Sequence, residues 1–501
     1  MVEFDFAGAQ KRVADAYNPE LIRLTGHDLA EVLADHLRAV QQRSGKVLNW
    51  DDPADLTRVA AEFLRGKPAV EPTAALERWR ELVGVMLARG QNLHDPRYIG
   101  HQVPASIPLA GLFDAIGAVT NQVMAIFEMG PFATAVERAM VEKLGSLIGF
   151  PTDTFAGAVT HGGSLANLTA LLTARNVALG DSWERGVDAG DGRPVLIAQA
   201  DSHYSVARSV GVLGLGTKNI VRAALDQKRR MDPARLDATI GELRRAERPI
   251  VAVSASACAT PIGAFDPLEA IADVCERHNV WLHVDAAHGG AACLSLRHRH
   301  LLRGLQRADS VVWDAHKMLF MPALSAFVFY KNRAHQFEAF RQDAPYLFDP
   351  SAPAMAEYDS GIRVMECTKR AQALGLWGTW SLFGEQLFAD LVDVTFQLGQ
   401  TFHAKLAEAA DFVPLHVPQC NIVAFRHVPA VLRDAEPETL GAFQLELRRK
   451  LIESGEYYIV PTTFEGTGAL RVTIINPLTT ADDLDGLMQT LRRQGRELLD
   501  R

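Results

Sequence analysis

Short apolar runs that alternate with helical segments constrain the fold of this chain more than any other feature. From about residue 91 onward, the apolar runs are PVLIAQA, NIVRAAL, PIVAVSAS, VWLHVDAA, SVVWDAH and SAFVFYK. Amphipathic stretches such as DPARLDATIGELRRAE and DPLEAIADVCERHN lie between several of them. Strands that are apolar throughout are buried on both faces, as in a parallel sheet covered by helices. The pattern therefore predicts an α/β fold with a mainly parallel sheet.

The two ends of the chain differ from this central region. Residues 1–90 show helical periodicity, and the last residues return to long helices and the strands NIVAFRHV and ALRVTIINP. A final helix begins at TADD, where Thr480 is the expected N-cap and Asp483 follows three residues later. We expect a helical N-terminal segment (1–90), a large α/β domain (91–375) and a small α+β domain (376–501).

Composition and charge argue against several classes of protein. The chain has 501 residues, of which 48% are apolar and 22% charged, and its net charge of −9 is not accompanied by a basic cluster of five or more residues. These values are typical of a soluble globular protein and argue against a nucleic-acid partner. No apolar stretch reaches the length of a transmembrane helix, the N-terminus lacks the features of a signal peptide, and the five cysteines show no CxxC spacing. We expect a cytoplasmic protein with reduced thiols, no membrane span and no metal site.

Ligands of open α/β sheets bind at the carboxyl ends of the strands, and the first motif at such an end is THGGSLANLTALLTARN (160–176). An apolar run leads into Gly162, Gly163 and Ser164, and a strong helix follows. Glycines allow close approach of the backbone, and a helix N-terminus offers free N–H groups to an anion. The motif therefore indicates a phosphate site, although a glycine turn with Ser164 as an ordinary N-cap is the alternative.

Two further motifs place an acid and a lysine at strand ends. Asp285 closes the run VWLHVDAA, and Lys317 follows the run SVVWDAH. Since 32 residues separate the two side chains, we expect them on neighbouring strands with both ends at one edge of the sheet. The alternatives are a helix-capping or salt-bridged aspartate and a lysine that extends into solvent from a strand end. Burial near an apolar strand end is expected to lower the pKa of Lys317.

The three motifs together match the needs of one cofactor. Pyridoxal 5'-phosphate (PLP) requires a cradle for its phosphate, a carboxylate that keeps its ring nitrogen protonated, and a lysine that forms an imine with its aldehyde. The sequence offers Gly163 and Ser164, Asp285, and Lys317 for these three roles.

The same motifs resemble those of the group II PLP-dependent amino-acid decarboxylases, which include glutamate, aromatic amino-acid and diaminobutyrate decarboxylases. Three family signatures, HVDAA-x-x-G, D/N-x-H-K and GGS-x-A-N, are matched by residues 283–290, 314–317 and 162–167. The resemblance implies the aspartate-aminotransferase-like fold (fold type I) with a seven-stranded large domain. It also implies a homodimer whose active sites lie at the subunit boundary and whose N-terminal segment helps to form the dimer.

The resemblance also implies the roles of individual residues. The expected catalytic residues are Lys317, His203 and Asp285. The expected cofactor-binding residues are Gly163, Ser164, His203, Ser256, Asp285, Ala287, Asp314, His316 and Lys317. For the substrate, the match indicates His101 and Arg471. Without the family context, His203 is a loop histidine and Arg471 a strand arginine in a surface ion pair.

The sequence departs from the family pattern at three positions. The threonine near the ring is replaced by Ser256, and Asp314 stands where several relatives have asparagine. Ala354 occupies the position of a loop tyrosine whose hydroxyl is a natural acid for protonating Cα. We therefore name His203 and Tyr358 as alternative proton donors, with His203 preferred.

The activity implied is α-decarboxylation of an L-amino acid to the amine and CO2. The segments DPRYIGHQVPAS and NQVMAIFEMGP favour an acidic or diamino substrate such as glutamate, aspartate or 2,4-diaminobutyrate over an aromatic one. The enzymatic alternatives are a decarboxylating aldehyde synthase and an aminotransferase, and a non-catalytic relative of the same fold is the third possibility.

Overall fold

The computed structural model describes residues 4–65, 72–187, 192–340 and 357–500. Its centre is a seven-stranded sheet with the strand order β2-β8-β7-β6-β5-β3-β4. The strands are β2 (Ala156–Thr160), β3 (Val195–Gln199), β4 (Ile220–Ala223), β5 (Ile250–Ser256), β6 (Leu282–Asp285), β7 (Ser310–Asp314) and β8 (Ala326–Tyr330). Only β8 pairs antiparallel with its two neighbours, so the sheet is mainly parallel, as predicted.

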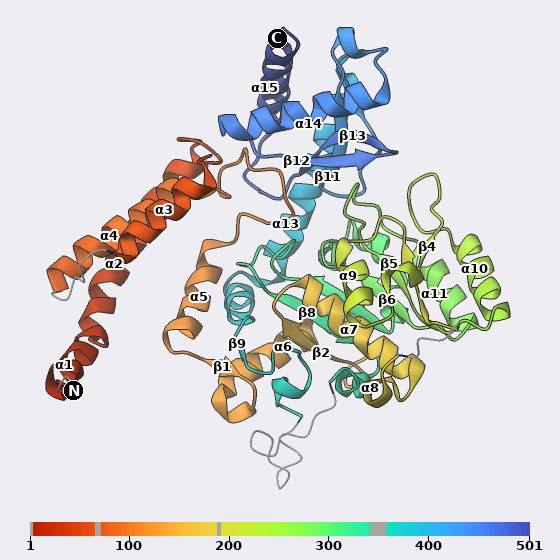
Figure 1. The fold of residues 1–501 in the computed structure, drawn as a ribbon, viewed down its shortest axis with the longest axis horizontal. Helices are drawn as coiled ribbons and strands as arrows, with labels where there is room; N and C mark the ends of the chain where they lie inside the picture. The colour runs from red at the N-terminus through yellow and green to blue at the C-terminus, as the bar shows by residue number, and fades with distance from the viewer. Residues whose placement is uncertain (1–3, 66–71, 188–191, 341–356, 501) are drawn as a thin grey trace.

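Helices cover both faces of this sheet (Figure 1). One face packs against α7 (Gly163–Leu179) and α9 (Tyr204–Val212), and the other against α6 (Pro131–Ile148), α10 (Pro233–Arg245), α11 (Leu268–Arg277) and α13 (Leu374–Glu408). Alternate residues of one strand pack into opposite cores. Phe327 and Phe329 of β8 face the core with α6 and α13, and Val328 faces the core with α7 and α9. A sheet buried on both faces explains why its strands read as continuous apolar runs.

The remaining helices of the large region lie at its margins. They are α5 (Pro108–Val119) and the single turn α8 (Ser182–Arg185), and the short strands β1 (Val123–Met124) and β9 (Lys369–Arg370) pair antiparallel beside α6. A 3-10 helix, Gly289–Leu294, follows β6.

The C-terminal region forms a second, smaller layer of sheet and helices. Four antiparallel strands in the order β10-β11-β13-β12 pack against α14 (Pro437–Ser454) and α15 (Ala481–Leu499). The strands are β10 (Phe412–Pro414), β11 (Ile422–His427), β12 (Val460–Phe464) and β13 (Thr467–Thr473). Thr480 caps α15 in a capping box with Asp483, as predicted. The long helix α13, which is interrupted at Gly384, spans the predicted boundary at residues 375/376 and joins the two regions.

The N-terminal helices extend away from the rest of the molecule (Figure 1). They are α1 (Phe6–Ala16), α2 (Pro19–Gln41), α3 (Pro53–Leu64) and α4 (Pro72–Arg89). Within the described part of the chain, no helix is both long enough and apolar enough to cross a membrane. The chain therefore has the predicted architecture, in which a mainly parallel seven-stranded sheet follows a helical N-terminus and precedes a small antiparallel sheet.

Candidate active site

The turn between β2 and α7 places backbone N–H groups at the carboxyl edge of the sheet. Gly162 has a φ of 95°, a conformation that side-chain-bearing residues rarely adopt. At Gly163, a Cβ atom would lie 2.6 Å from Oδ2 of Asp314, so only glycine fits against this carboxylate. The N-terminus of α7, with Ser164 in its first turn, is therefore open to an anionic group.

Asp285 and Lys317 lie at the same edge, because β6 and β7 are parallel neighbours. The carboxylate of Asp285 accepts a hydrogen bond from Nδ2 of Asn167 at 2.9 Å and one from the backbone N–H of Ala287 at 3.1 Å. Asp285 is only 8% exposed, so these donors compensate for the loss of water around its charge. They also fix the direction in which the carboxylate points.

A buried polar network holds Asn167 in place. Its Oδ1 accepts from Nε2 of His283 at 2.9 Å, and the other ring nitrogen of His283 contacts Oγ of Ser310 at 2.9 Å. Burial lowers the pKa of His283 to about 4, which keeps the ring neutral. Neither Asn167 nor His283 is among the predicted site residues, although both belong to the family signatures, which were the available signal.

Lys317 forms an ion pair with Asp314, with Nζ 3.1 Å from Oδ2. Burial acts to lower the pKa of Lys317, but the carboxylates of Asp314 and Asp285 outweigh it, and the pKa is raised. The expectation that desolvation would lower this pKa is therefore wrong for the cofactor-free protein. The error arose because the sequence does not give the distance between the amine and the acids.

His203 caps α9 and faces the same site. The backbone N–H of Ser205 donates to its Nδ1 at 3.3 Å, so the neutral ring carries its proton on Nε2. Burial lowers the pKa of His203. Oγ of Ser205, 2.8 Å from Nδ1 of His203, also accepts from Nδ2 of Asn167, which links His203 to the network around Asp285.

These side chains surround one cavity of about 340 Å³. All predicted cofactor residues line it, namely Gly163, Ser164, His203, Ser256, Asp285, Ala287, Asp314, His316 and Lys317. Gln102, His161, Asn167, Cys258 and His288 line it as well, without having been predicted. A larger cavity of about 650 Å³ lies at the opposite edge of the sheet, beside the starts of β5 and β6, and none of the predicted residues lines it.

The two predicted substrate residues do not line the cavity. His101 is exposed, while its neighbour Gln102 lines the cavity. Arg471, on β13, is 8% exposed and donates from Nη1 to the backbone oxygen of Thr260 at 2.8 Å, and Thr260 is a lining residue. Burial lowers the pKa of Arg471 to about 10, and its Nε has no hydrogen-bond partner among the described residues.

The loop that carries the aligned Ala354 lies outside the described residues. Tyr358 lies just beyond this loop. The guanidinium carbon of Arg138 is 4.2 Å from the centroid of the Tyr358 ring, and the centroid of the Phe127 ring is 5.6 Å from it. Tyr358 is therefore not a lining residue of the cavity in this chain, whereas His203 is.

The residues of the cavity fit PLP. The free N–H groups at the N-terminus of α7, where Gly163 and Ser164 line the cavity, suit a phosphate group. Asp285 is an oriented acceptor that would suit a protonated ring nitrogen, the small side chain of Ala287 would leave room for a flat ring, and Lys317 would provide the amine. Oδ1 of Asp314, buried without a hydrogen-bond partner among the described residues, is a further acceptor at this site.

Comparison with known proteins agrees with this geometry. Residues 88–428 match the model of the pyridoxal-dependent decarboxylase conserved domain. The chain is 31% identical to cysteine sulfinic acid decarboxylase of Homo sapiens over 91% of this chain and 92% of that protein. It is 28% identical to the acidic amino acid decarboxylase GADL1 of Homo sapiens over 90% of this chain and 87% of that protein.

A solved structure shows the same relationship at the level of the fold. The crystal structure of mouse CSAD superposes with a TM-score of 0.81 at 28% identity and covers 93% of this chain and 99% of that one. The family match spans most of the chain and includes the cavity with Asp285 and Lys317. The chain therefore belongs to the pyridoxal-dependent decarboxylases, and it is an amino-acid decarboxylase that uses PLP.

Proposed function

We propose that this decarboxylase acts on a small acidic L-amino acid, such as aspartate, glutamate or cysteine sulfinate, and releases CO2 and the amine. The observation that carries the proposal is Arg471. Its guanidinium is buried beside the lining residue Thr260, and its Nε has no hydrogen-bond partner among the described residues. A buried cation without a counter-ion is costly, and an anionic group of the substrate would provide one.

Two further points support an acidic substrate over a diamino one. The relatives at 31% and 28% identity are named for cysteine sulfinic acid and for acidic amino acids. The ammonium group of 2,4-diaminobutyrate would meet the positive charge of Arg471, which is unfavourable because like charges repel. Gln102 lines the cavity and could donate an amide N–H to the same anionic group, so we propose it in place of the neighbouring His101.

The roles of the other residues follow from their positions. Bound PLP supplies an aldehyde that bonds to amines and a ring that withdraws electrons from Cα. Asn167 and the N–H of Ala287 orient Asp285, which holds the proton on the ring nitrogen. Gly163, Ser164 and His316 bind at the phosphate end, Ser256 and Ala287 line the ring, and Lys317 provides the amine for the aldehyde. Asp314 holds Lys317 at 3.1 Å when the amine is free.

His203 is the residue that we propose to protonate Cα after CO2 leaves. The imidazolium form transfers the proton from Nε2, and the neutral ring that remains keeps its other proton on Nδ1, 2.8 Å from Oγ of Ser205. Since Ala354 has no proton to give, a lining histidine is the natural donor. Amine is then the main product, and aldehyde would mark the alternative activity of an aldehyde synthase.

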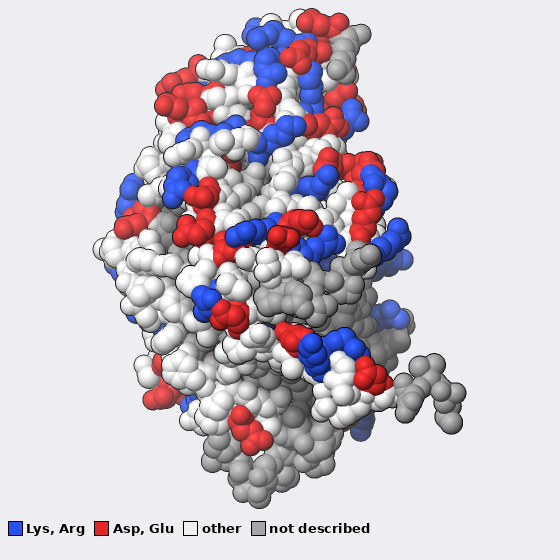
Figure 2. All heavy atoms as spheres, turned by 90° about the vertical axis from the view of Figure 1, so that its left-hand side faces the viewer, with Lys and Arg blue, Asp and Glu red and all other residues white. Residues whose placement is uncertain are grey.

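We also propose a homodimer. Along α5, Leu109, Leu112, Ile116 and Val119 share one helical face, and the last three are at least 56% exposed. On the side of the molecule that Figure 2 shows, acidic and basic side chains are interspersed among broad uncharged areas. An exposed apolar face such as that of α5 is typical of a subunit interface. The five cysteines form no disulfide, which fits a reducing compartment such as the cytoplasm.

The test is a screen of purified holoprotein against individual amino acids, with CO2 and amine both quantified. We expect turnover of acidic amino acids and little turnover of 2,4-diaminobutyrate, phenylalanine or tyrosine. In the variant Arg471→Ala, the KM for the acidic substrate should rise by roughly tenfold or more, because a charge-assisted hydrogen bond is lost. The cofactor absorbance should stay unchanged. Preference for a diamino or aromatic substrate would contradict the proposal, as would loss of the cofactor from the variant.

A further inference from the structure

His161 is a cavity residue to which no role has yet been assigned. It directly precedes Gly162, the N-cap of α7, and its side chain lines the same cavity as Gly163 and Ser164. Its side chain is 37% exposed, so a ligand in the cavity can reach it. The sequence places it within the motif THGGS, at the point where the chain turns from strand to helix.

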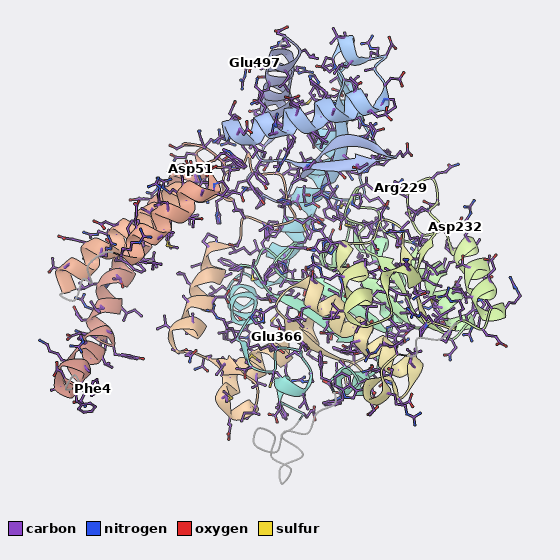
Figure 3. The ribbon with its side chains drawn as sticks, viewed as in Figure 1. Phe4, Asp51, Arg229, Asp232, Glu366 and Glu497 are labelled. Carbon is purple, nitrogen blue, oxygen red and sulfur yellow. The ribbon has the colours of Figure 1, made fainter. Side chains whose placement is uncertain are left out.

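Glu366 fixes the imidazole of His161. One carboxylate oxygen, Oε1, lies 2.9 Å from Nδ1 and also accepts the backbone N–H of His161 at 3.1 Å. Glu366 itself is largely buried and lies close to β9 and α6 (Figure 3). A carboxylate next to Nδ1 selects the form of the ring that carries a proton there. Nε2 then points away from Glu366, and it makes no hydrogen bond to any residue in the described ranges.

The charges around the glycine turn show what Nε2 could bind. The carboxylate of Asp314 lies directly against Gly163, so an anion at the N-terminus of α7 sits beside a buried negative charge. Two neighbouring side chains already contact that acid, with Nζ of Lys317 3.1 Å and Nε2 of His316 3.6 Å from Oδ2. A dianionic phosphate needs another positive charge, and among the lining residues His161 is the imidazole adjacent to the turn.

We propose that His161 binds the phosphate group of PLP through Nε2, as an imidazolium held between that phosphate and Glu366, and thereby controls how tightly the cofactor is retained. His161 acts as a donor to the phosphate, and Glu366 is a positioning residue. The inference rests on the cofactor and not on the substrate proposed above, so a different substrate would leave it intact.

The test compares PLP with pyridoxal, which lacks the phosphate group. Full-length protein is stripped of cofactor, and the dissociation constant of each compound is measured from the absorbance of the bound cofactor. In His161→Gln, the dissociation constant of PLP should rise by roughly tenfold or more, since a charge-assisted hydrogen bond is lost. The constant for pyridoxal should change by less than about twofold. Glu366→Gln should also raise the dissociation constant of PLP, but by a smaller factor than His161→Gln.

A matched control is available on the surface. His278 forms an equivalent pair with Asp237, Nε2 to Oδ1 at 2.7 Å, far along the chain from the motif, and neither residue lines the cavity. His278→Gln should leave both constants unchanged. An equal loss of PLP and pyridoxal in His161→Gln would show that His161 only shapes the turn, and an unchanged constant for PLP would show that it does not contact phosphate. If His161→Gln does not fold, the same comparison is made in Glu366→Gln. A larger rise in the dissociation constant of PLP than of pyridoxal supports the phosphate contact, and an equal rise contradicts it.

Discussion

At the scale of single residues, the cavity is organised by pairs of groups rather than by isolated side chains. Asp285 depends on Asn167, Lys317 on Asp314, and His203 on Ser205. The partner of Asp285 lies 118 residues away in the sequence, whereas the partners of Lys317 and His203 are near neighbours in the chain. In each pair the partner orients the other side chain, which we propose to contact the cofactor or the substrate.

Replacing Asp285 with asparagine tests the proposed partner of the ring nitrogen. An amide does not keep that nitrogen protonated, so kcat should fall by at least about a hundredfold, the scale of losing one oriented electrostatic group. The measurement is steady-state turnover at saturating PLP, together with circular dichroism to show that the fold is kept. Asn167→Ala, which removes only the orienting donor, should show a smaller loss. A turnover near that of the wild type in Asp285→Asn would place the essential carboxylate elsewhere.

At the scale of elements, a buried ion pair connects α6, β2 and β9. Nζ of Lys369 lies 2.8 Å and 2.9 Å from the two carboxylate oxygens of Glu137, and Oε1 of Glu137 also accepts the backbone N–H of Val159 at 3.2 Å. The Lys369 side chain is fully buried. The pair holds the edge of the central sheet that carries the glycine turn.

Lys369→Met should therefore destabilise the protein by about 3–5 kcal/mol, because it leaves the Glu137 carboxylate buried without its counter-ion. The measurement is the free energy of unfolding in urea. Lys143→Met is the control, because Lys143 lies on α6, the helix of Glu137, and pairs with Glu385 at the surface. Surface ion pairs contribute at most about 1 kcal/mol. Adding Glu137→Leu to Lys369→Met should restore much of the loss. An equal loss of unfolding free energy in the two lysine variants would contradict the stabilising role of the Lys369–Glu137 pair.

The loop between β10 and β11 gives a prediction about pH. Burial lowers the pKa of His416 to about 4, and its Nε2 accepts the backbone N–H of Ala424 at 3.1 Å, which requires the neutral ring. Below about pH 6.5, the unfolded chain binds a proton at this histidine and the folded chain does not. The contribution of His416 to stability is therefore complete above pH 6.5 and is lost as the pH falls towards 4.

The measurement is the free energy of unfolding of the wild type and of His416→Gln between pH 7 and pH 4.5. The difference between them should shift in favour of the variant by up to about 1.4 kcal/mol per pH unit below pH 6.5. The wild type and the variant are compared because burial raises the pKa of Asp266 to about 7, so Asp266 stabilises the folded protein as the pH falls over the same range. This contribution is the same in both proteins and cancels in the difference. A difference that does not vary with pH would mean that His416 titrates normally.

At the scale of the whole molecule, the apolar face of α5 and the projecting N-terminal helices determine the assembly that we propose. Ile116 is 59% exposed at the centre of the α5 face. Ile116→Glu should place a charge inside the dimer interface and shift the protein towards monomer, with loss of activity. Light scattering after size-exclusion chromatography measures the mass. Arg235→Glu, on the exposed face of α10, is the control and should leave the mass unchanged. A wild-type protein that is already monomeric would rule out the dimer.

The sequence by itself determined the fold class, the glycine turn before α7 and the placement of Asp285 and Lys317 at neighbouring strand ends. These features depend on short-range patterns, namely apolar runs, glycine turns and the spacing of strand ends, and they are visible along the chain. The capping box of Thr480 and Asp483 was predictable for the same reason.

Only the tertiary structure decided which groups face one another. It placed Asp314 at 3.1 Å from Lys317, which reversed the expected direction of the lysine pKa, and it brought Gln102 rather than His101 to the cavity. It also placed Tyr358 against Arg138 and joined His161 to Glu366 across 205 residues of sequence. Electrostatic interactions depend on distance and burial, and neither quantity is set by the order of residues along a chain until the chain has folded.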